Sequence, residues 1–578
     1  MATNLLALWI PRQIGGAIGS LLESQNQGTP IDIATIKRYA TTIAAFALLA
    51  CLARILSRVL IFFAGRLIEY DMRNELFAQL TKLDADWYQQ QSTGDLISRI
   101  INDVNSVRAM YGFSALNLVN TLITYTVVLS FMFSVSPKMT WLSLAPYPFI
   151  ILTMLLFTRA LYVRTQASQA QLAEVSAHAQ EGLAGVQVVR TFAIEDEMNA
   201  RFGAASDEYA HRNVRLAYVR GALFPFVASI GSIGGLIILW FGGLSVIQGG
   251  AGDISLGEFV EFSAYITALA WPTAGLGWSL TVWQRGIAGF DRLSLILQTP
   301  PKVADKIEGA SEQPVTPEVQ AALRSDIALE NVALRWEDGS YGLQDISVRI
   351  PAGSFTAIVG RTGAGKTSLA ELLVRLRDPS EGSIWLGDMP LEEIPIAQLR
   401  SRIGFVPQDA FLFSRSVRDN IELGRLAHEE RGTPWKSSVQ LEDAIRIATL
   451  DEAIVDFQDG IDTMVGERGI TLSGGQKQRV TIARAVLLDP DILILDDALA
   501  SVDTRTEHRI LQELAQIMDG RTTILITHRF NALSIADKIL VLDDGILVEE
   551  GTHDELIALG GVYADMVERQ RMEEDLSQ

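Results

Sequence analysis

One octapeptide has the residue types and spacing of a phosphate-binding loop. Residues 360–367 read GRTGAGKT, which fits G-x-x-x-x-G-K-[ST], and they follow the apolar run Phe355–Val359. In such loops, successive backbone N–H groups and a helix N-terminus surround phosphate oxygens. Lys366 would add a mobile positive charge, and the Thr367 hydroxyl would be a ligand of Mg²⁺. The residues expected to bind the nucleotide here are Gly360, Arg361, Thr362, Gly363, Ala364, Gly365, Lys366, Thr367 and Ser368.

A pair of carboxylates follows a second apolar run. Residues 492–495 (ILIL) are too few for a helix and predict a buried parallel strand, which ends at Asp496 and Asp497. In a doubly wound sheet, ligands bind at the carboxyl ends of the strands. Asp496 is therefore expected beside the phosphates, where it would hold Mg²⁺ directly or through water.

A small-residue turn, LSGGQ at 472–476, lies between these two elements and should open a helix over Lys477–Leu488, which Asp489-Pro490 would end. At this distance from the phosphate loop, the turn makes the sequence resemble the ATP-binding cassette (ABC) transporter family, over the whole chain. The resemblance implies that the turn binds the γ-phosphate of ATP held by an opposite subunit, so that only a dimer completes an ATP site. The residues so assigned to the partner's ATP are Leu472, Ser473, Gly474, Gly475, Gln476 and Asp503.

Three more positions match the family. Trp336, 24 residues before Gly360, is expected to stack on adenine; Tyr341 is the weaker candidate, and a core role for Trp336 is the alternative. Gln408 matches the glutamine that touches Mg²⁺ and the attacking water, and its segment is expected to receive a coupling helix. His528, at the end of the predicted strand Thr522–Ile526, matches the histidine that contacts the γ-phosphate. The resemblance thus implies ATP and Mg²⁺ as cofactors, Asp497, His528 and Gln408 as catalytic groups, and Thr367, Gln408 and Asp496 as Mg²⁺ ligands.

The sequence departs from the family at Asp497, where a glutamate usually polarises the attacking water. Aspartate is one methylene shorter, about 1 Å of reach, and such a misplacement can cost about 100-fold in rate. Because LSGGQ is intact, the chain resembles the degenerate-site subunit of a heterodimeric multidrug exporter. The implied partner is a homologous half-transporter that carries the glutamate. A homodimer in which Asp497 serves as the base is the alternative.

The charge distribution divides the chain. Residues 1–298 hold 20 basic and 20 acidic residues, so the net charge of −20 belongs to residues 299–578. A neutral apolar half joined to an acidic half predicts a membrane domain followed by a soluble one. The soluble half has no basic stripe, which argues against nucleic acid as a partner. The single cysteine, Cys51, excludes a disulfide or a cysteine-based metal site within one chain.

Hydropathy and resemblance together predict a multi-domain fold: an all-α transmembrane domain of six helices with long intracellular helices (1–298), a linker (299–326), and an α/β P-loop ATPase domain (327–578). The expected spans are 2–22, 39–65, 111–133, 141–157, 218–247 and 257–284, and the expected coupling segments are 84–101 and 182–197. Span two should continue into an amphipathic helix over 66–83, and Pro146 and Pro148 should bend span four. Arginines between 159 and 220 place the coupling segments, the ATPase domain and both termini in the cytoplasm, with the spans in the cell (inner) membrane among its lipids.

Several features of the membrane half admit two interpretations. Pro11-Arg12 interrupts the first apolar stretch, and a chain that begins partway through its first span is one explanation. Arg54 and Arg58 lie four residues apart in span two, where they face a cavity or an interface, or else snorkel towards the cytoplasm. Trp271, Trp278 and Trp283 either line a pocket for a small amphipathic substrate or anchor and pack the span.

Three functions remain open from the sequence. The first is an exporter half-subunit, and the second is a flippase for a lipid or lipid conjugate, for which Arg12, Arg54 and Arg58 are the hints. The third is a regulatory subunit whose ATP is structural.

Overall fold

The structure is a computed structural model of the 578-residue chain. It describes residues 2–27, 33–248, 254–306, 315–425, 438–466, 472–517, 520–529, 533 and 535–577. The chain forms two compact units, a helical unit (1–81 and 91–299) and an ATPase unit (82–90 and 300–578). Part of the segment between the predicted spans 218–247 and 257–284, and part of the predicted linker, lie outside the described residues.

The helical unit contains long helices joined by short turns and three π-helical segments. They are α1 (Ala2–Asn26), α2 (Ile33–Leu80), α4 (Thr93–Ser98), η1 (Arg99–Asp103), α5 (Val104–Ala109), η2 (Met110–Ser114), α6 (Ala115–Val135), α7 (Pro137–Leu144), α8 (Tyr147–Ala184), α9 (Val186–Thr191), α10 (Glu195–Ile237), η3 (Ile238–Gly242), α11 (Gly243–Gln248) and α12 (Leu256–Gln298).

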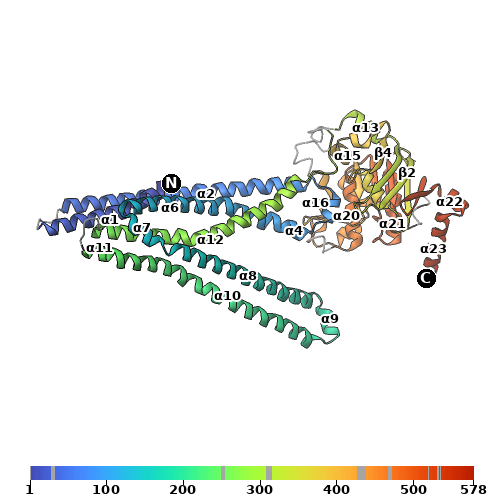
Figure 1. The fold of residues 1–578 in the computed structure, drawn as a ribbon. Helices are drawn as coiled ribbons and strands as arrows, with labels where there is room; N and C mark the ends of the chain where they lie inside the picture. Colours follow the sequence, from blue (N-terminus) through green and yellow to red (C-terminus); the bar gives the residue numbers. More distant parts are fainter. Residues whose placement is uncertain are drawn as a thin grey trace. The chain divides into compact units, whose positions relative to one another are not determined.

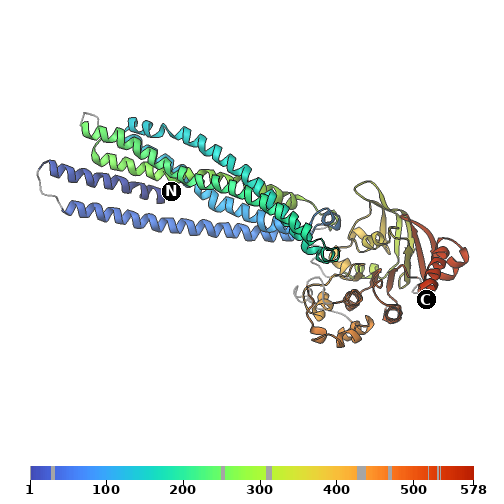
Figure 2. The same cartoon turned by 90° about the horizontal axis from the view of Figure 1, so that it is seen from below.

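The helices pack in antiparallel pairs. α1 lies along α2, and α8 lies along α10, with the short α9 closing that hairpin at its end (Figures 1 and 2). α12 contacts α1, α6 and α10, so it runs through the middle of the unit. α1 and α12 approach closely at Gly15 and Gly257: a Cβ on Gly257 would lie 2.4 Å from the carbonyl oxygen of Gly15.

The helix bounds agree with several of the sequence expectations. α2 is one unbroken helix that contains the predicted span 39–65 and most of the segment 66–83. The chain breaks between α7 and α8 at Ala145-Pro146, where a bend was expected, because a proline cannot donate the hydrogen bond that would continue α7.

Pro11-Arg12 interrupts the first apolar stretch but not the first helix, which contains the whole predicted span 2–22. α1 runs without a break from Ala2 to Asn26 with Pro11 inside it. Proline removes one backbone hydrogen bond, and helices packed on both sides can hold the remaining turns in place. Here α2 and α12 flank α1.

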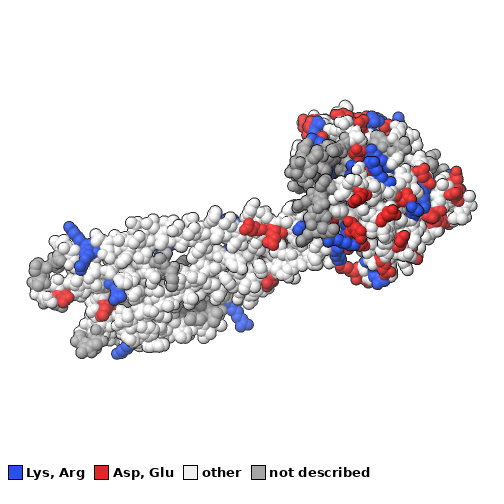
Figure 3. All heavy atoms as spheres, turned by 90° about the horizontal axis from the view of Figure 1, so that it is seen from above, with Lys and Arg blue, Asp and Glu red and all other residues white. Residues whose placement is uncertain are grey.

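Within the described residues, three continuous helical stretches are long and apolar enough to cross a membrane: 5–25, 33–80 and 93–135. The face drawn in Figure 3 agrees with this composition, since charged side chains are few on the helical unit and numerous on the ATPase unit. The other predicted spans fall on α7–α8, α10–α11 and α12, which are also long helices but do not meet that criterion, so the six-span count stays a prediction.

The ATPase unit is built from two sheets and the helices that cover them. Its helices are α3 (Ala85–Gln89), α13 (Pro317–Leu323), α14 (Lys366–Leu373), η5 (Leu391–Glu393), α15 (Ile396–Arg400), α16 (Val417–Ile421), α18 (Leu441–Ile447), α19 (Asp451–Val455), η6 (Gly460–Asp462), α20 (Gly474–Leu487), α21 (Thr504–Ile517), α22 (His553–Leu559) and α23 (Val562–Ser577). Its strands are β1 (Ile327–Arg335), β2 (Tyr341–Ile350), β3 (Phe355–Gly360), β4 (Glu381–Leu386), β5 (Met389–Pro390), β6 (Ile403–Val406), β7 (Ile492–Asp496), β8 (Thr522–Ile526), β9 (Lys538–Asp543) and β10 (Ile546–Gly551).

Of the two sheets, one carries the predicted nucleotide-binding motifs at its strand ends. The first has the strand order β10-β9-β3-β8-β7-β6 and is parallel except for β10; the second, β2-β1-β4-β5, is antiparallel. β3, β7 and β8 are buried at every residue, which explains why each appears in the sequence as an uninterrupted apolar or β-branched run.

Part of the predicted linker is helical. Within 299–326, residues 317–323 form α13, which begins at Pro317 after the N-cap Thr316. Val319, Ala322 and Leu323 of this helix are buried in the core of the ATPase unit. Residues 317–323 therefore belong to that unit.

Candidate nucleotide site

The nucleotide site forms where three neighbouring parallel strands end. β8 lies between β3 and β7, and Ile526 of β8 is level with both Ile358 of β3 and Asp496 of β7. The phosphate loop follows β3, Asp497 follows β7 and His528 follows β8. Because parallel strands end at one edge, groups from positions 360–367, 496–497 and 528 meet there.

At two positions of the phosphate loop, only glycine fits the backbone conformation and the space available. Gly365 has φ +92°, and a Cβ there would lie 2.6 Å from the carbonyl oxygen of Gly342; a Cβ on Gly360 would lie 2.2 Å from that of Leu542. α14 starts directly after Gly365, so its free N–H groups face the loop.

Lys366 points back into this loop. Its Nζ donates to the carbonyl oxygens of Gly360 (2.9 Å) and Arg361 (2.8 Å). The side chain is almost fully buried, and this burial lowers the pKa of Lys366, while the nearby Asp497 and Asp496 oppose the shift. An ammonium group among loop carbonyls is positioned for phosphate oxygens.

Asp496 has the properties of a magnesium ligand. It is buried, it is hydrogen-bonded to Thr367, and its Oδ2 has no hydrogen-bond partner. Burial raises the pKa of Asp496, and the negative charge of Asp497 adds to the effect. A buried carboxylate oxygen without a donor is costly unless a cation or donor satisfies it.

The donor set of oxygens fits Mg²⁺, which prefers carboxylate, hydroxyl and phosphate ligands. Thr367, Gln408 and Asp496 line the same cavity of about 310 Å³ and would hold the ion. When bound, Mg²⁺ neutralises charge on the phosphates. Within the described residues, no cluster of three or more His, Cys, Asp or Glu side chains forms a second kind of metal site.

Asp497 and His528 lie on the same cavity wall as Lys366. The Asp497 backbone has φ +45°, a left-handed conformation that aspartate adopts more easily than most residues. Its N–H donates to the carbonyl oxygen of Ile526 (3.0 Å), which fixes it to β8. Burial and the charge of Lys366 lower the pKa of His528, and Asp497 opposes the shift, so the ring is neutral at pH 7.

The aromatic wall comes from the other sheet. Trp336 follows β1 and lies in the tight turn to β2, where its N–H donates to the carbonyl oxygen of Ser340 (2.8 Å). The guanidinium of Arg377 lies over the Trp336 ring, 4.7 Å from its centroid. Trp336 is partly buried against the core and also lines the cavity, so both interpretations of this residue hold in part.

The structure thus brings most of the predicted nucleotide residues to one cavity. Its walls are Trp336, Tyr341, Gly342, Thr362, Gly363, Gly365, Lys366, Thr367, Ser368, Gln408, Asp496, Asp497, Ile526 and His528. Gly360, Arg361 and Ala364 do not line it, although Gly360 and Arg361 supply the carbonyl oxygens that hold Lys366. Gly342 and Ile526 were not anticipated, and only their register on β2 and β8 explains their place.

The predicted partner-ATP surface forms a second, separate cavity of about 380 Å³. Its walls are Ser473, Gly474, Gly475, Arg479, Ser501, Val502 and Asp503. α20 begins at Gly474, not at Lys477 as expected, because Ser473 caps it: the Ser473 hydroxyl accepts from the Gln476 N–H (3.3 Å), and Gln476 Oε1 accepts from the Ser473 N–H (2.9 Å). Leu472 is buried in the core.

Leu472 and Gln476 therefore shape the turn and do not line this cavity. Arg479 was not predicted. It lies six residues after Ser473, within the first two turns of α20, and nothing in the sequence at this position indicates that it lines the cavity.

Two side chains hold the loop that carries Asp503. Gln478 Oε1 accepts from the Ser501 N–H (2.9 Å), which ties α20 to the loop that carries Asp503. Arg529 donates to the carbonyl oxygens of Val502 (2.8 Å) and Ala500 (2.9 Å), which ties the same loop to the residue after His528.

Fold and site together define a P-loop nucleoside triphosphatase domain joined to a helical domain suited to a membrane. Comparison with known proteins narrows this class. The description "ABC transporter transmembrane region" matches residues 1–273, and "ABC transporter" matches residues 343–500.

Similar proteins include the multidrug resistance-like ATP-binding protein MdlA of Escherichia coli, 33% identical with 98% of this chain and 92% of that protein covered. The ATP-dependent lipid A-core flippase of Syntrophus aciditrophicus is 32% identical, with 90% of this chain and 83% of that protein covered. A solved structure of a bacterial Atm1-family ABC exporter with ATP bound has a TM-score of 0.77 at 28% identity, covering 98% of this chain and 96% of the other.

The chain belongs to the ABC transporter family, as an exporter half-transporter whose transmembrane domain is fused to its ATPase domain. It is a multi-pass integral membrane protein that binds ATP and couples ATP hydrolysis to transport.

Proposed function

We propose that this chain is one half of a heterodimeric exporter that moves amphipathic or drug-like molecules out of the cell. Two cassettes would close on two ATP molecules, the coupling segments would pass the motion to the helices, and the helices would alternate access. The spans would lie in the cell (inner) membrane, with the ATPase unit and both termini in the cytoplasm. The name of the multidrug-type relative supports this cargo class.

The observation that carries the proposal is the carboxylate of Asp497. It occupies the general-base position, but it is short and its backbone is held by Ile526 in a left-handed conformation. General-base catalysis contributes about 10²–10⁴ in rate, and a misplacement of about 1 Å removes about 10² of it. The chain's own site would therefore bind ATP and hydrolyse it slowly.

The second cavity supports the other half of the proposal. Ser473, Gly474 and Gly475 offer N–H groups, a hydroxyl and the start of α20 on one surface, which suits a γ-phosphate presented from outside the chain. A partner half-transporter that carries the glutamate would supply that phosphate. The fast site would then combine the partner's phosphate loop with this chain's Ser473.

Asp497→Asn in the assembled transporter tests the proposal. This change removes the carboxylate and keeps the size of the side chain. If the other site does the hydrolysis, ATPase activity should stay within about twofold of the unmodified complex. A homodimer that uses Asp497 as its base would instead lose about 100-fold or more.

The same preparation identifies the partner. A second homologous chain should copurify, with glutamate at the position that corresponds to Asp497. Activity of a preparation that contains only this chain, at the level of the complex, would exclude the heterodimer. An inactive chain that also fails to support hydrolysis by its partner would favour the regulatory function.

A lipid or lipid-conjugate flippase is the second candidate. One similar protein is named a lipid A-core flippase, and a cavity among the helices contains two arginines. ATP-dependent transfer of a fluorescent lipid between leaflets of reconstituted vesicles, against export of a soluble dye, distinguishes the two functions.

A further inference from the structure

Two arginines lie in the apolar part of α2. Arg54 is 15 residues into the predicted span 39–65, or about 22 Å along the helix. Arg58 follows one turn later. Because the hydrocarbon layer is about 30 Å thick, Arg54 lies within it or at its inner boundary. An arginine at this depth is costly unless it faces a polar cavity or a partner, and it usually serves a function.

Neither arginine has a protein anion beside it. Among the described residues, no Asp or Glu oxygen lies within 4.0 Å of Arg54 or Arg58. Some other arginines of the helical unit are paired. Arg66 and Arg73 contact the buried Glu69 at 2.7 and 2.8 Å, and Arg292 forms two hydrogen bonds with Asp103. Arg54 and Arg58 have in common that both lack such a partner and both lie in the apolar part of α2 beside one cavity.

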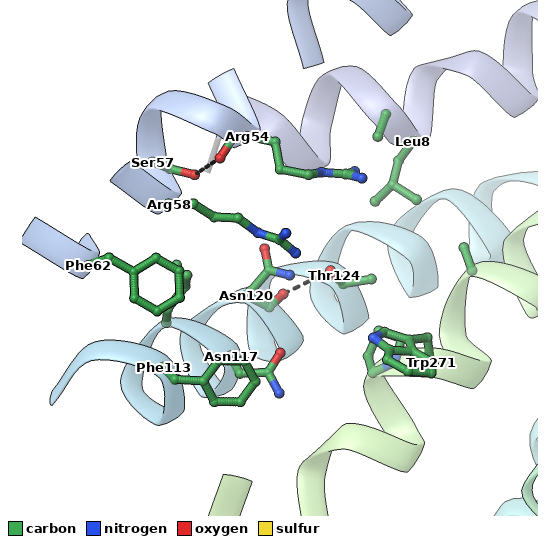
Figure 4. A pocket seen from close by; sticks show the side chains of 14 residues that line it. Leu8, Arg54, Ser57, Arg58, Phe62, Phe113, Asn117, Asn120, Thr124 and Trp271 are labelled. Carbon is green, nitrogen blue, oxygen red and sulfur yellow. Dashed lines mark hydrogen bonds between the residues drawn. The ribbon is translucent and has the colours of Figure 1, made fainter. Parts of the chain in front are cut away.

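Both side chains lie along a cavity within the helical unit. Its volume is about 490 Å³, and its walls come from α1, α2, α6 with the preceding η2, and α12. In Figure 4, Arg54 extends from α2 towards Leu8 of α1, and Arg58 extends towards Asn120 of α6, with Trp271 on another wall. The lining residues are Ala7, Leu8, Arg54, Ser57, Arg58, Phe62, Phe113, Leu116, Asn117, Asn120, Thr124, Ala268, Trp271 and Pro272.

The cavity is lined by polar and by large apolar side chains. The polar ones include Arg54, Arg58 and the amides of Asn117 and Asn120. The Asn117 amide donates to the Ser279 hydroxyl (2.7 Å), an arrangement that holds this side chain in place. Phe62 and Trp271 are large apolar walls, and Trp271 is 79% exposed. Of the three tryptophans singled out from the sequence, Trp271 lines the cavity, whereas Trp278 packs edge-on against Phe113.

Snorkelling explains this arrangement less well. A snorkelling arginine extends along its own helix towards the nearer membrane surface. Arg54 and Arg58 instead share one face of α2 and reach across the same cavity, as Figure 4 shows. Their separation of four residues puts both guanidinium groups on that face.

We propose that this cavity binds an amphiphile with an anionic headgroup, a phosphate or a carboxylate, and that such amphiphiles are the transported class. The inference rests on the proposed export function and specifies its cargo. Guanidinium groups bind phosphate and carboxylate oxygens through paired, charge-assisted hydrogen bonds. Phe62 and Trp271 would contact the tail.

The test is equilibrium binding to the complete transporter in nanodiscs of phosphatidylcholine, without ATP. Three probes share one dansyl-labelled dodecyl tail and carry a phosphate, a trimethylammonium or a maltoside headgroup. The variants are Arg54→Gln, Arg58→Gln and the double change. Arg38→Gln is the matched control, because Arg38 lies on the same helix, is exposed and does not line the cavity. Inorganic phosphate serves as a competitor.

The expected result is a preference of the unmodified transporter for the phosphate probe. Each single change should weaken its binding about tenfold and the double change about 100-fold, since charge-assisted hydrogen bonds are the strong ones. Binding of the maltoside probe should stay the same, and Arg38→Gln should bind all probes as the unmodified protein does.

Three results would overturn the inference: unchanged phosphate-probe binding in the double variant, tighter binding of the trimethylammonium probe by the unmodified protein, or competition by inorganic phosphate as strong as that by unlabelled dodecyl phosphate. The last result would indicate a small-anion site. Because the assay needs no hydrolysis, it is independent of the Asp497 proposal. Failure of ATP-dependent transport with intact anionic preference would refute the export function alone.

Discussion

Ser473→Arg is the sharpest perturbation of the proposed asymmetry. Ser473 lies at the mouth of the cavity of about 380 Å³ that is expected to receive the partner's γ-phosphate. An arginine there would occupy the space between the turn and Asp503. It would also remove the hydroxyl and the cap of α20.

The size of the effect follows from these contacts. Loss of a serine cap costs about 1 kcal/mol of stability, or about 2–4 °C in melting temperature for a unit of this size. Loss of two charge-assisted hydrogen bonds to phosphate costs about 3–4 kcal/mol, which is a factor of about 100 to 1000 in rate. The ATPase activity of the complex should therefore fall by about 100- to 1000-fold.

Ser473→Ala is the matched control. It removes the same cap and hydroxyl without filling the cavity, so its melting temperature should fall as much as that of Ser473→Arg. Its ATPase activity should fall only about tenfold, the loss expected for one hydrogen bond. The assay is steady-state ATPase of the purified complex, with melting measured in parallel. Half or more of the activity remaining in Ser473→Arg would refute the assignment of Ser473 to the working site.

Two further predictions concern the ligand-free site. Asp496→Asn should raise the unfolding free energy by about 1–3 kcal/mol without nucleotide, because it replaces a buried carboxylate charge with a neutral amide of the same size. It should also abolish the extra stabilisation by Mg²⁺ with ATP, as measured by thermal melts with and without both, and full stabilisation of the variant by Mg²⁺ with ATP contradicts the magnesium assignment. His528→Gln should flatten one part of the pH–stability curve. Burial lowers the pKa of His528 below its ordinary value of 6.5, so the unfolded state binds more protons in that window, and stability rises with pH up to about 6.5; denaturant melts from pH 5 to 8 measure the slope, and an identical slope in the variant contradicts a buried, neutral His528.

The parallel sheet could be predicted because fully buried parallel strands have a recognisable pattern in the sequence. β3, β7 and β8 are buried at every position, so alternation is absent and each strand appears as a short apolar or β-branched run before a polar motif. The predicted strand 522–526 matches β8 residue for residue. Motif spacing placed the phosphate loop, Asp496 and His528 at the strand ends, where the structure has them.

Local signals failed where tertiary contacts decided the outcome. Pro11 is a local signal for a helix break, but the helix continues through it, as the predicted span 2–22 requires, because α1 packs against α2 and α12. Prolines between 300 and 317 predicted a linker, although Thr316-Pro317 is a helix-start signal, a cap followed by proline at the first helical position. The cavity residues Arg479 and Gly342 carry no signal of their own. They reach their sites because α20 begins at Gly474, after the N-cap Ser473, and because β2 lies beside the phosphate loop.

Residues 84–90, the start of the predicted first coupling segment, contact the neighbourhood of Trp336. Asp86 of α3 forms an ion pair with Arg377, and Arg377 covers the ring of Trp336. Asp84 and Gln90, which flank α3, contact Lys302 and Glu337. The coupling contact expected at the Gln408 segment stays a prediction.

Arg377 cannot follow a movement of α3 freely. It is 5% exposed, and it is also bound to Glu371 at 2.6 Å. Separating a buried charge from its partner costs about 3–5 kcal/mol. A shift of α3 must therefore either carry Arg377 away from the Trp336 ring or break its ion pair with Asp86, at a cost of that size. In both cases the position of α3 and the surroundings of the Trp336 ring, the surface expected to stack on adenine, depend on each other through one guanidinium group.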